Sequence, residues 1–72
     1  MIIEVVRVDD DGKPGTVLDT VTLEDDGAIT TDTGRGRDLV AGKVLQFGPQ
    51  RAAEILRDWS NGYVLTREVA PE

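Results

Sequence analysis

The stretch Pro49–Val64, PQRAAEILRDWSNGYV, has the clearest secondary-structure pattern in the chain. Its apolar residues recur at three- and four-residue intervals, so one side of a helix would carry Ala52, Ile55, Leu56 and Trp59. Pro49 suits the first turn of this helix, because its missing N–H would have no partner within the helix there. Asn61 and Gly62 tolerate positive φ angles and favour a reversal of the chain. The pattern predicts a helix over residues 49–59 followed by a turn.

Residues 63–69, YVLTREV, are rich in β-branched and aromatic side chains and predict a strand that returns alongside the helix. The three aromatic residues of the chain, Phe47, Trp59 and Tyr63, lie in or beside this unit. We therefore expect the hydrophobic core to centre on them. Trp59 is expected to pack in that core; the alternative is an interface anchor, since Trp is a typical hot-spot residue.

The N-terminal part of the chain predicts an antiparallel β-meander. Residues 2–8, IIEVVRV, alternate so that the odd-numbered side chains share one face and the even-numbered side chains share the other. The turn-forming run DDDGKPG follows, then a strand over 16–23, a turn at EDDG and a third strand over 28–31. Because the first strand carries one acid, Glu4, among its first five residues, we expect it to be central in the sheet or covered by a second chain.

Residues 32–47 connect the meander to the helix and give a weaker pattern. Residues 38–41 predict one helical turn that ends at Gly42, and residues 44–47 predict a short strand or an extended connection that places Leu45 and Phe47 in the core. The sequence therefore predicts an α+β fold in one domain, residues 1–72. A meander of strands at about 2–8, 16–23 and 28–31 would pack on one main helix, about 49–59, with a C-terminal strand at about 63–69.

The chain contains no cysteine and no histidine. This composition excludes disulfides and thiolate nucleophiles, and it removes the usual general base at neutral pH and the usual zinc ligand. Acid–base catalysis by two carboxylates would need a concave apolar site, whereas the acidic residues here are expected in turns. We therefore expect a protein that is not an enzyme and has no cofactor.

The formal net charge of −6 arises from the first third of the chain. Residues 1–26 contain two basic residues, Arg7 and Lys13, and eight acidic residues: Glu4, Asp9, Asp10, Asp11, Asp19, Glu24, Asp25 and Asp26. Nucleic-acid binding is not expected, because basic residues that neutralise phosphates supply most of its affinity. No apolar run reaches the roughly 18–20 residues of a membrane span, so membrane insertion is not expected either.

Two motifs are candidates for ligand binding. If Gly12 is aligned with the glycine of a calcium-binding loop, Arg7 and Leu18 fall at the first and last ligand positions, so no metal site is predicted. The segment Gly34-Arg35-Gly36-Arg37 combines two glycines with two guanidinium groups, which could hold a phosphate or carboxylate. Arg35 and Arg37 are therefore candidate anion or partner contacts, and the alternative is a flexible loop that offsets nearby acids. Trp59 and Tyr63 are the other candidate partner contacts.

The motifs DDDGKPG, DDGAI, the glycine–arginine loop and the closing WSNGYV resemble short uncharacterised proteins of high-GC actinobacteria and their phages. The preference for Val, Asp, Gly and Arg over Lys and Asn adds to this resemblance. It carries no catalytic motif. It implies a phage-related or mobile-element accessory protein, located in the cytoplasm or within a phage particle.

Two hypotheses about function follow. The first is a non-enzymatic protein-interaction module that binds a protein partner or copies of itself, because a chain with few reactive side chains and a small core gains stability by burying surface. The alternative is an acidic inhibitor or regulator that presents its N-terminal carboxylates to a basic protein surface, in the manner of a nucleic-acid mimic. Modest salt would dissociate the second kind of complex more readily than the first.

Overall fold

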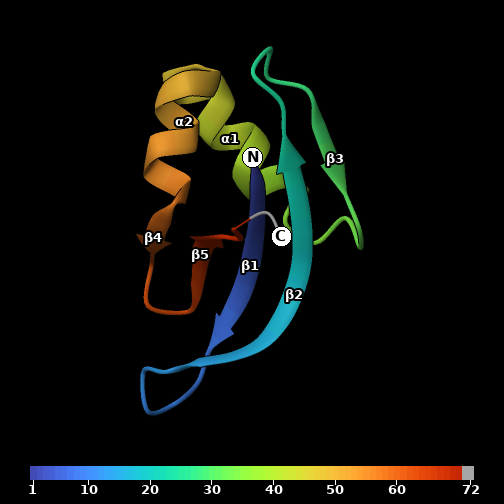
Figure 1. Cartoon of the computed structure of the whole chain (residues 1–72). Coiled ribbons are helices and arrows are strands. Elements are labelled where there is room, and N and C mark those ends of the chain that lie inside the picture. Colours follow the sequence, from blue (N-terminus) through green and yellow to red (C-terminus); the bar gives the residue numbers. More distant parts are fainter. Residues whose placement is uncertain (71–72) are drawn as a thin grey trace.

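The computed structural model describes residues 1–70 and places two helices on one face of a five-stranded antiparallel sheet (Figure 1). The strand order is β3-β2-β1-β5-β4. The strands are β1 Ile2–Val8, β2 Pro14–Leu23, β3 Ile29–Thr31, β4 Asp58–Ser60 and β5 Val64–Glu68. The helices are α1 Arg37–Phe47 and α2 Pro49–Leu56. The predicted α+β class, the N-terminal meander and the C-terminal strand are confirmed.

Strand β1 is the central strand of the sheet, which confirms one of the two outcomes expected for it. It pairs antiparallel with β2 on one side and with β5 on the other. Strands β3 and β4, of three residues each, are the two edges of the sheet. Short edge strands limit unwanted pairing with other chains.

Strand β2 contains a bulge that changes which of its side chains face the helices. Val5 lies opposite Asp19, but the next residue, Val6, lies opposite Val17, so Leu18 is an extra residue in β2. A bulge of this kind bends the strand and resets its alternation. Asp19 consequently shares the helix-covered face with Val5, while Val17 shares the opposite face with Val6.

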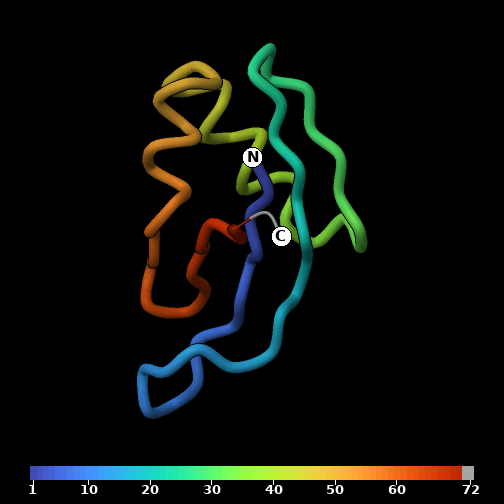
Figure 2. The backbone as a smooth tube through the Cα atoms, viewed as in Figure 1, coloured from blue at the N-terminus to red at the C-terminus, as the bar shows by residue number. Residues whose placement is uncertain are grey.

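The turns between strands follow the glycine and asparagine signals of the sequence. Gly12, Gly27 and Gly62 all have positive φ angles, of 81°, 91° and 90°. In the β4–β5 turn the side-chain oxygen of Asn61 accepts hydrogen bonds from the backbone N–H groups of Tyr63 and Val64. The β1–β2 and β2–β3 turns lie at opposite ends of β2 (Figure 2).

Helix α1 corrects the expectation for residues 38–47. The structure has an 11-residue helix, which continues through Gly42 and includes the segment 44–47 that was expected to be extended. Apolar residues occur all around this helix, and Leu45 is 90% exposed, so the sequence has no clear helical stripe. Tertiary packing of Val40, which is fully buried, stabilises the helix despite the cost of about 0.5–1 kcal/mol for an internal glycine.

Helix α2 begins at Pro49 as expected but ends at Leu56 rather than at residue 59. Residues 58–60 form β4 instead, where Trp59 lies opposite Thr66 of β5. The tight turn at Asn61 and Gly62 brings the two flanking segments side by side, and their backbone groups pair as a hairpin. This pairing overrides the helical spacing of Trp59.

The expectation that the core centres on the aromatic residues is wrong. Phe47 is 42% exposed, Tyr63 is 80% exposed and Trp59 is half-buried. The core is aliphatic and joins the sheet to both helices; its buried members are Ile3, Val5, Val21, Leu23, Val40, Ala52 and Leu56. These aliphatic side chains fill the space between the sheet and the helices.

Candidate interaction surfaces

The loop that carries the predicted anion contacts encloses the carboxylate of Asp19. Asp19 is 2% exposed, and its Oδ1 accepts hydrogen bonds from the backbone N–H groups of Thr20, Asp32 and Thr33 at 2.9, 3.1 and 2.7 Å. Its Oδ2 accepts one from the N–H of Gly36 at 2.8 Å. The backbone of this loop therefore binds an anion, as its glycines suggested, but the anion is a side chain of the same protein.

These hydrogen bonds decide the ionisation of Asp19. Burial alone raises the pKa of its carboxyl group, but the N–H groups of Thr33, Gly36 and Thr20 and the Thr33 hydroxyl stabilise the charged form. The net result is a pKa below its usual value of 3.8. Asp19 is ionised at neutral pH and lies at the N-terminal end of α1, where the helix dipole favours a negative charge.

Gly36 is required in this loop for space. A Cβ atom at this position would lie 2.7 Å from Cγ2 of Val5 and 3.0 Å from Cγ2 of Val21, closer than side chains normally pack. Its φ angle of −91° is open to any residue, so the constraint is contact with the sheet and not backbone conformation. The loop therefore packs directly on the core.

Arg35 and Arg37 flank Gly36 and are both exposed. Their backbone N–H groups donate to Thr33 Oγ1 and to the carbonyl oxygen of Gly34, respectively. Neither guanidinium group takes part in the ion pairs formed within residues 1–70. The two side chains remain accessible, beside a backbone that already holds Asp19.

Trp59 and Tyr63 lie at the other edge of the sheet, so the structure does not bring the four predicted contact residues together. Tyr63 is in the exposed β4–β5 turn, whereas the loop with Arg35 and Arg37 follows β3. Strands β3 and β4 are the two opposite edges. The four residues cannot form one binding site.

Trp59 instead belongs to a small cluster with α1. The Nζ atom of Lys43 lies 4.9 Å from the ring centre of Trp59 and 5.9 Å from that of Phe47. A cation within about 6 Å of an aromatic face is attracted by the ring. The faces of both rings thus already contact a cation of the same chain.

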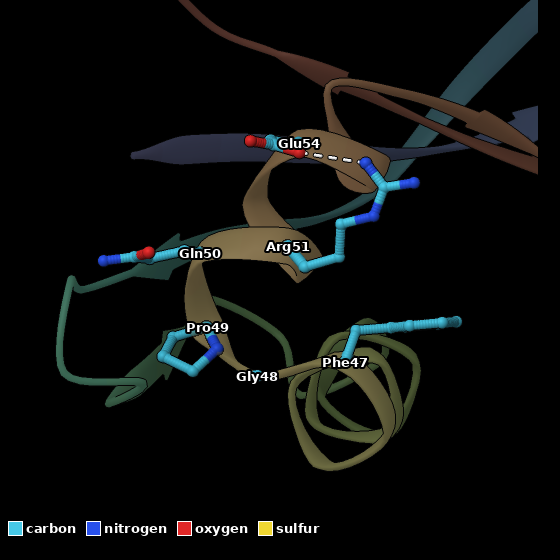
Figure 3. Close-up of a pocket in the computed structure, with 6 residues that line it drawn as sticks. All are labelled: Phe47, Gly48, Pro49, Gln50, Arg51 and Glu54. Atoms are coloured by element: carbon cyan, nitrogen blue, oxygen red, sulfur yellow. Dashed lines mark hydrogen bonds and ion pairs between the residues drawn. The ribbon is translucent and has the colours of Figure 1, made fainter.

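A shallow depression lies beside this cluster at the junction of α1 and α2 (Figure 3). The side chains of Phe47 and Arg51 extend to the same side of the junction, and Arg51 Nη1 is 2.9 Å from Glu54 Oε2 (Figure 3). Both charged side chains are more than half exposed. A surface ion pair of this kind contributes little to stability.

The side of the sheet turned away from α1 and α2 forms a further surface, which we call the open sheet face. No helix among the described residues packs on it, since both helices contact the opposite side. The strand registers place the following residues on it: Ile2, Glu4 and Val6 of β1; Val17, Thr20 and Thr22 of β2; Thr30 of β3; Leu65 and Arg67 of β5. Asp58 and Ser60 of β4 lie at its edge.

Apolar side chains and one ion pair occupy the middle of the open sheet face. Val6 is fully buried between Val17 and Leu65, whereas Ile2 and Val17 are 40% and 42% exposed. Beside Val6, Arg67 Nε lies 2.9 Å from Glu4 Oε1. Sequence reasoning identified the alternation of β1 but not this pair, whose members are 63 positions apart.

The acidic residues of the first third are dispersed by the fold. Asp9, Asp10 and Asp11 are exposed in the β1–β2 turn, and the acids of the β2–β3 turn lie at the other end of β2. Asp19 is enclosed and Glu4 is paired with Arg67. The eight acidic residues of the first third therefore lie at several separate places in the fold. Among residues 1–70, His, Cys, Asp and Glu side chains form no cluster of three that could hold a metal.

Neither a scan of protein-family models nor searches of curated proteins and of solved structures found a match for this chain. Within residues 1–70, neither helix combines the length and the apolar composition that crossing a membrane would require.

Proposed function

We propose that this protein is a non-enzymatic interaction module, a small structural or accessory component of an assembly, and that it binds protein through the open sheet face. The observation that carries the proposal is the composition of β1. Its inward residues Ile3 and Val5 form the core, and its outward residues Ile2 and Val6 are equally apolar. A strand that is apolar on both faces is typical of a sheet buried on both faces.

The fold covers one of these faces with helices, whereas no helix within residues 1–70 covers the other. On this second face Val6 is buried by its neighbours in the sheet and Ile2 is 40% exposed. An antiparallel sheet with a solvated face usually carries polar side chains there. The flanking strands follow this rule with Thr20, Thr22 and Thr30. The central strand departs from it, because Glu4 is the one polar residue among Ile2, Glu4 and Val6, and Glu4 is paired with Arg67. The partly exposed Ile2 and Val17 give this face apolar surface that a protein partner would bury.

The ionisation of Asp19 supports a non-enzymatic role. A general base at neutral pH needs a pKa near 7, which burial can provide for a carboxylate. Asp19 is the buried acid of the described chain; burial raises the pKa of its carboxyl group, but backbone hydrogen bonds from Thr33, Gly36 and Thr20 outweigh burial and lower it. Its carboxylate is a weak base that stabilises the loop before α1.

Site-specific photo-cross-linking in the native host tests the proposal. A benzophenone amino acid replaces Val17 on the open sheet face in one variant and Gln46, exposed on α1, in a matched control. We expect a discrete protein adduct from position 17 and none from position 46. Equal labelling at both positions, or no adduct at position 17, would refute the proposal.

A further inference from the structure

We infer that the partner of the open sheet face is a second copy of this chain, so that two sheets pack face to face in a symmetric dimer. This inference rests on the proposed function and names the partner. The evidence is the charge pattern of the face, its size and its partly exposed apolar residues, Ile2 and Val17.

The charges on the open sheet face are complementary to those of a second copy. Glu4 and Arg67 are neighbours on adjacent strands, β1 and β5, and lie opposite each other in register. In a two-fold dimer each residue contact occurs twice, with the roles of the copies exchanged. An axis parallel to the strands and between β1 and β5 sets Glu4 of each copy over Arg67 of the other. Four charges of alternating sign then meet at the centre of the interface.

The same axis also matches the apolar residues. Val6 lies opposite Leu65 in register, so the axis sets this level of β1 over β5 of the other copy. Val6 is fully buried in each copy, so the half-buried Leu65 and the partly exposed Val17 supply the contact here. Two aligned sheets normally pack with such side chains interdigitated about 10 Å apart. The partly exposed Ile2 and Val17 flank this centre and lose solvent contact in the dimer.

The size of the face suits a modest dimer. An axis between β1 and β5 leaves β3 without a counterpart, so the overlapping strands are β1, β2, β4 and β5. Their lengths of 7, 10, 3 and 5 residues, at about 3.3 Å by 4.8 Å per residue, give a footprint of roughly 400 Å² per copy. Two such footprints total roughly 800 Å², which is in the range of weak, transient interfaces. A partner with a strongly basic face would fit less well, because the acids responsible for the net charge of −6 lie mainly in the turns and not on this face.

Sedimentation equilibrium of the purified chain, from about 5 µM to about 500 µM, measures the dissociation constant directly. We expect the mass to rise from 7.8 kDa towards twice that value over this range. Glu4→Arg and Arg67→Glu should each weaken association at least tenfold, because each gives the centre of the face a single sign of charge. Mixing the two variants should restore association as a heterodimer, and the double variant should form a homodimer like the wild type.

Glu54→Arg and Arg51→Glu are the matched controls, since they reverse the same charges in an exposed ion pair on α2. They should leave the dissociation constant within twofold of the wild type. Circular dichroism checks that each variant folds, and Val17→Asp, in the exposed part of β2, provides a further folded monomer if a charge variant does not fold.

A wild-type chain that stays monomeric at about 500 µM would overturn the inference. Its dissociation constant would then lie above this concentration, which is too weak for a specific dimer. So would a mixture of the two charge variants that does not associate. The cross-link at position 17 separates this failure from that of the proposed function. An adduct with a different protein and a monomeric chain would retain the interaction module and reject the dimer.

Discussion

Replacement of Asp19 tests how much stability the loop before α1 derives from one carboxylate. Asp19 accepts four backbone hydrogen bonds, and the one from Gly36 is fully buried. Asp19→Ala leaves these N–H groups without their acceptor, and Asp19→Asn keeps one acceptor oxygen but removes the charge.

The expected magnitude follows from these contacts. A hydrogen bond to a charged group contributes about 1.5–3 kcal/mol, and we assign that value to the buried bond from Gly36 and less to the three half-buried ones. Asp19→Ala should therefore lower the free energy of unfolding by about 3–5 kcal/mol, as for loss of one partner in a buried charged network. Asp19→Asn should cost about 2–3 kcal/mol. A 72-residue domain has about 4–11 kcal/mol in total, so the alanine variant should be close to unfolding at 37 °C.

The pH dependence has a definite sign. The pKa of Asp19 is lower in the folded state than its ordinary value of 3.8, so the contribution of this carboxylate is fully present above about pH 4. It is lost as the pH falls below 3.8 through the lower folded pKa. The difference in stability between wild type and Asp19→Asn should be constant from pH 7 to pH 5 and should shrink below pH 4.

Urea denaturation followed by the fluorescence of Trp59, the single tryptophan, measures these values at pH 7, 5 and 3. Comparison of the variant with the wild type at the same pH isolates the contribution of Asp19. Equal stability of wild type and Asp19→Asn at pH 7, or a difference that does not change with pH, would refute the reasoning.

Four further substitutions test the packing. Gly36→Ala should destabilise the protein by about 1–3 kcal/mol, because its Cβ would meet Val5. Gly42→Ala should stabilise it by about 0.5–1 kcal/mol, because a Cβ at this position in α1 would have open space around it. Thermal unfolding of both variants distinguishes the effect of a close contact from that of helix propensity. Thr66→Val should stabilise by about 1 kcal/mol, since Oγ1 of Thr66 is buried without a hydrogen-bond partner among residues 1–70, and a loss of stability in urea titration would contradict this. Trp59→Ala should cost less than the about 3–5 kcal/mol of a core tryptophan, because the ring is half-buried; a larger cost by chemical denaturation would place Trp59 in the core.

The sequence by itself determined four of the five strands, β1, β2, β3 and β5, and the turns, whereas β4 was expected to be the end of a helix. β-Branched runs define β1, β2 and β5, and glycines with positive φ mark the turns, because these preferences depend on the sterics of one residue and its neighbours. Pro49 marks the start of α2 for the same local reason. The rule that long apolar strands are not left at an exposed edge limited β1 to a central position or to one covered by a second chain, and the structure shows the central position.

The tertiary structure decided the features that join distant residues. The sequence could not show that Asp19 would be enclosed by a loop 13–17 residues away, because that depends on the bulge at Leu18, which turns Asp19 towards the helices. Trp59 fitted a helical stripe, but backbone pairing with β5 placed it in an edge strand. Helix α1 lacks a helical stripe and forms because Val40 packs on the sheet.

The same distinction applies to the candidate surface. The alternation of β1 was visible in the sequence, and it indicated which side chains share a face. Glu4 and Arg67 become neighbours only because β5 pairs with β1 in one register, and Arg35 and Trp59 are separated only because β3 and β4 form opposite edges. Strand order and register arise from packing of the whole sheet against the helices, so they cannot be deduced from the preferences of short segments.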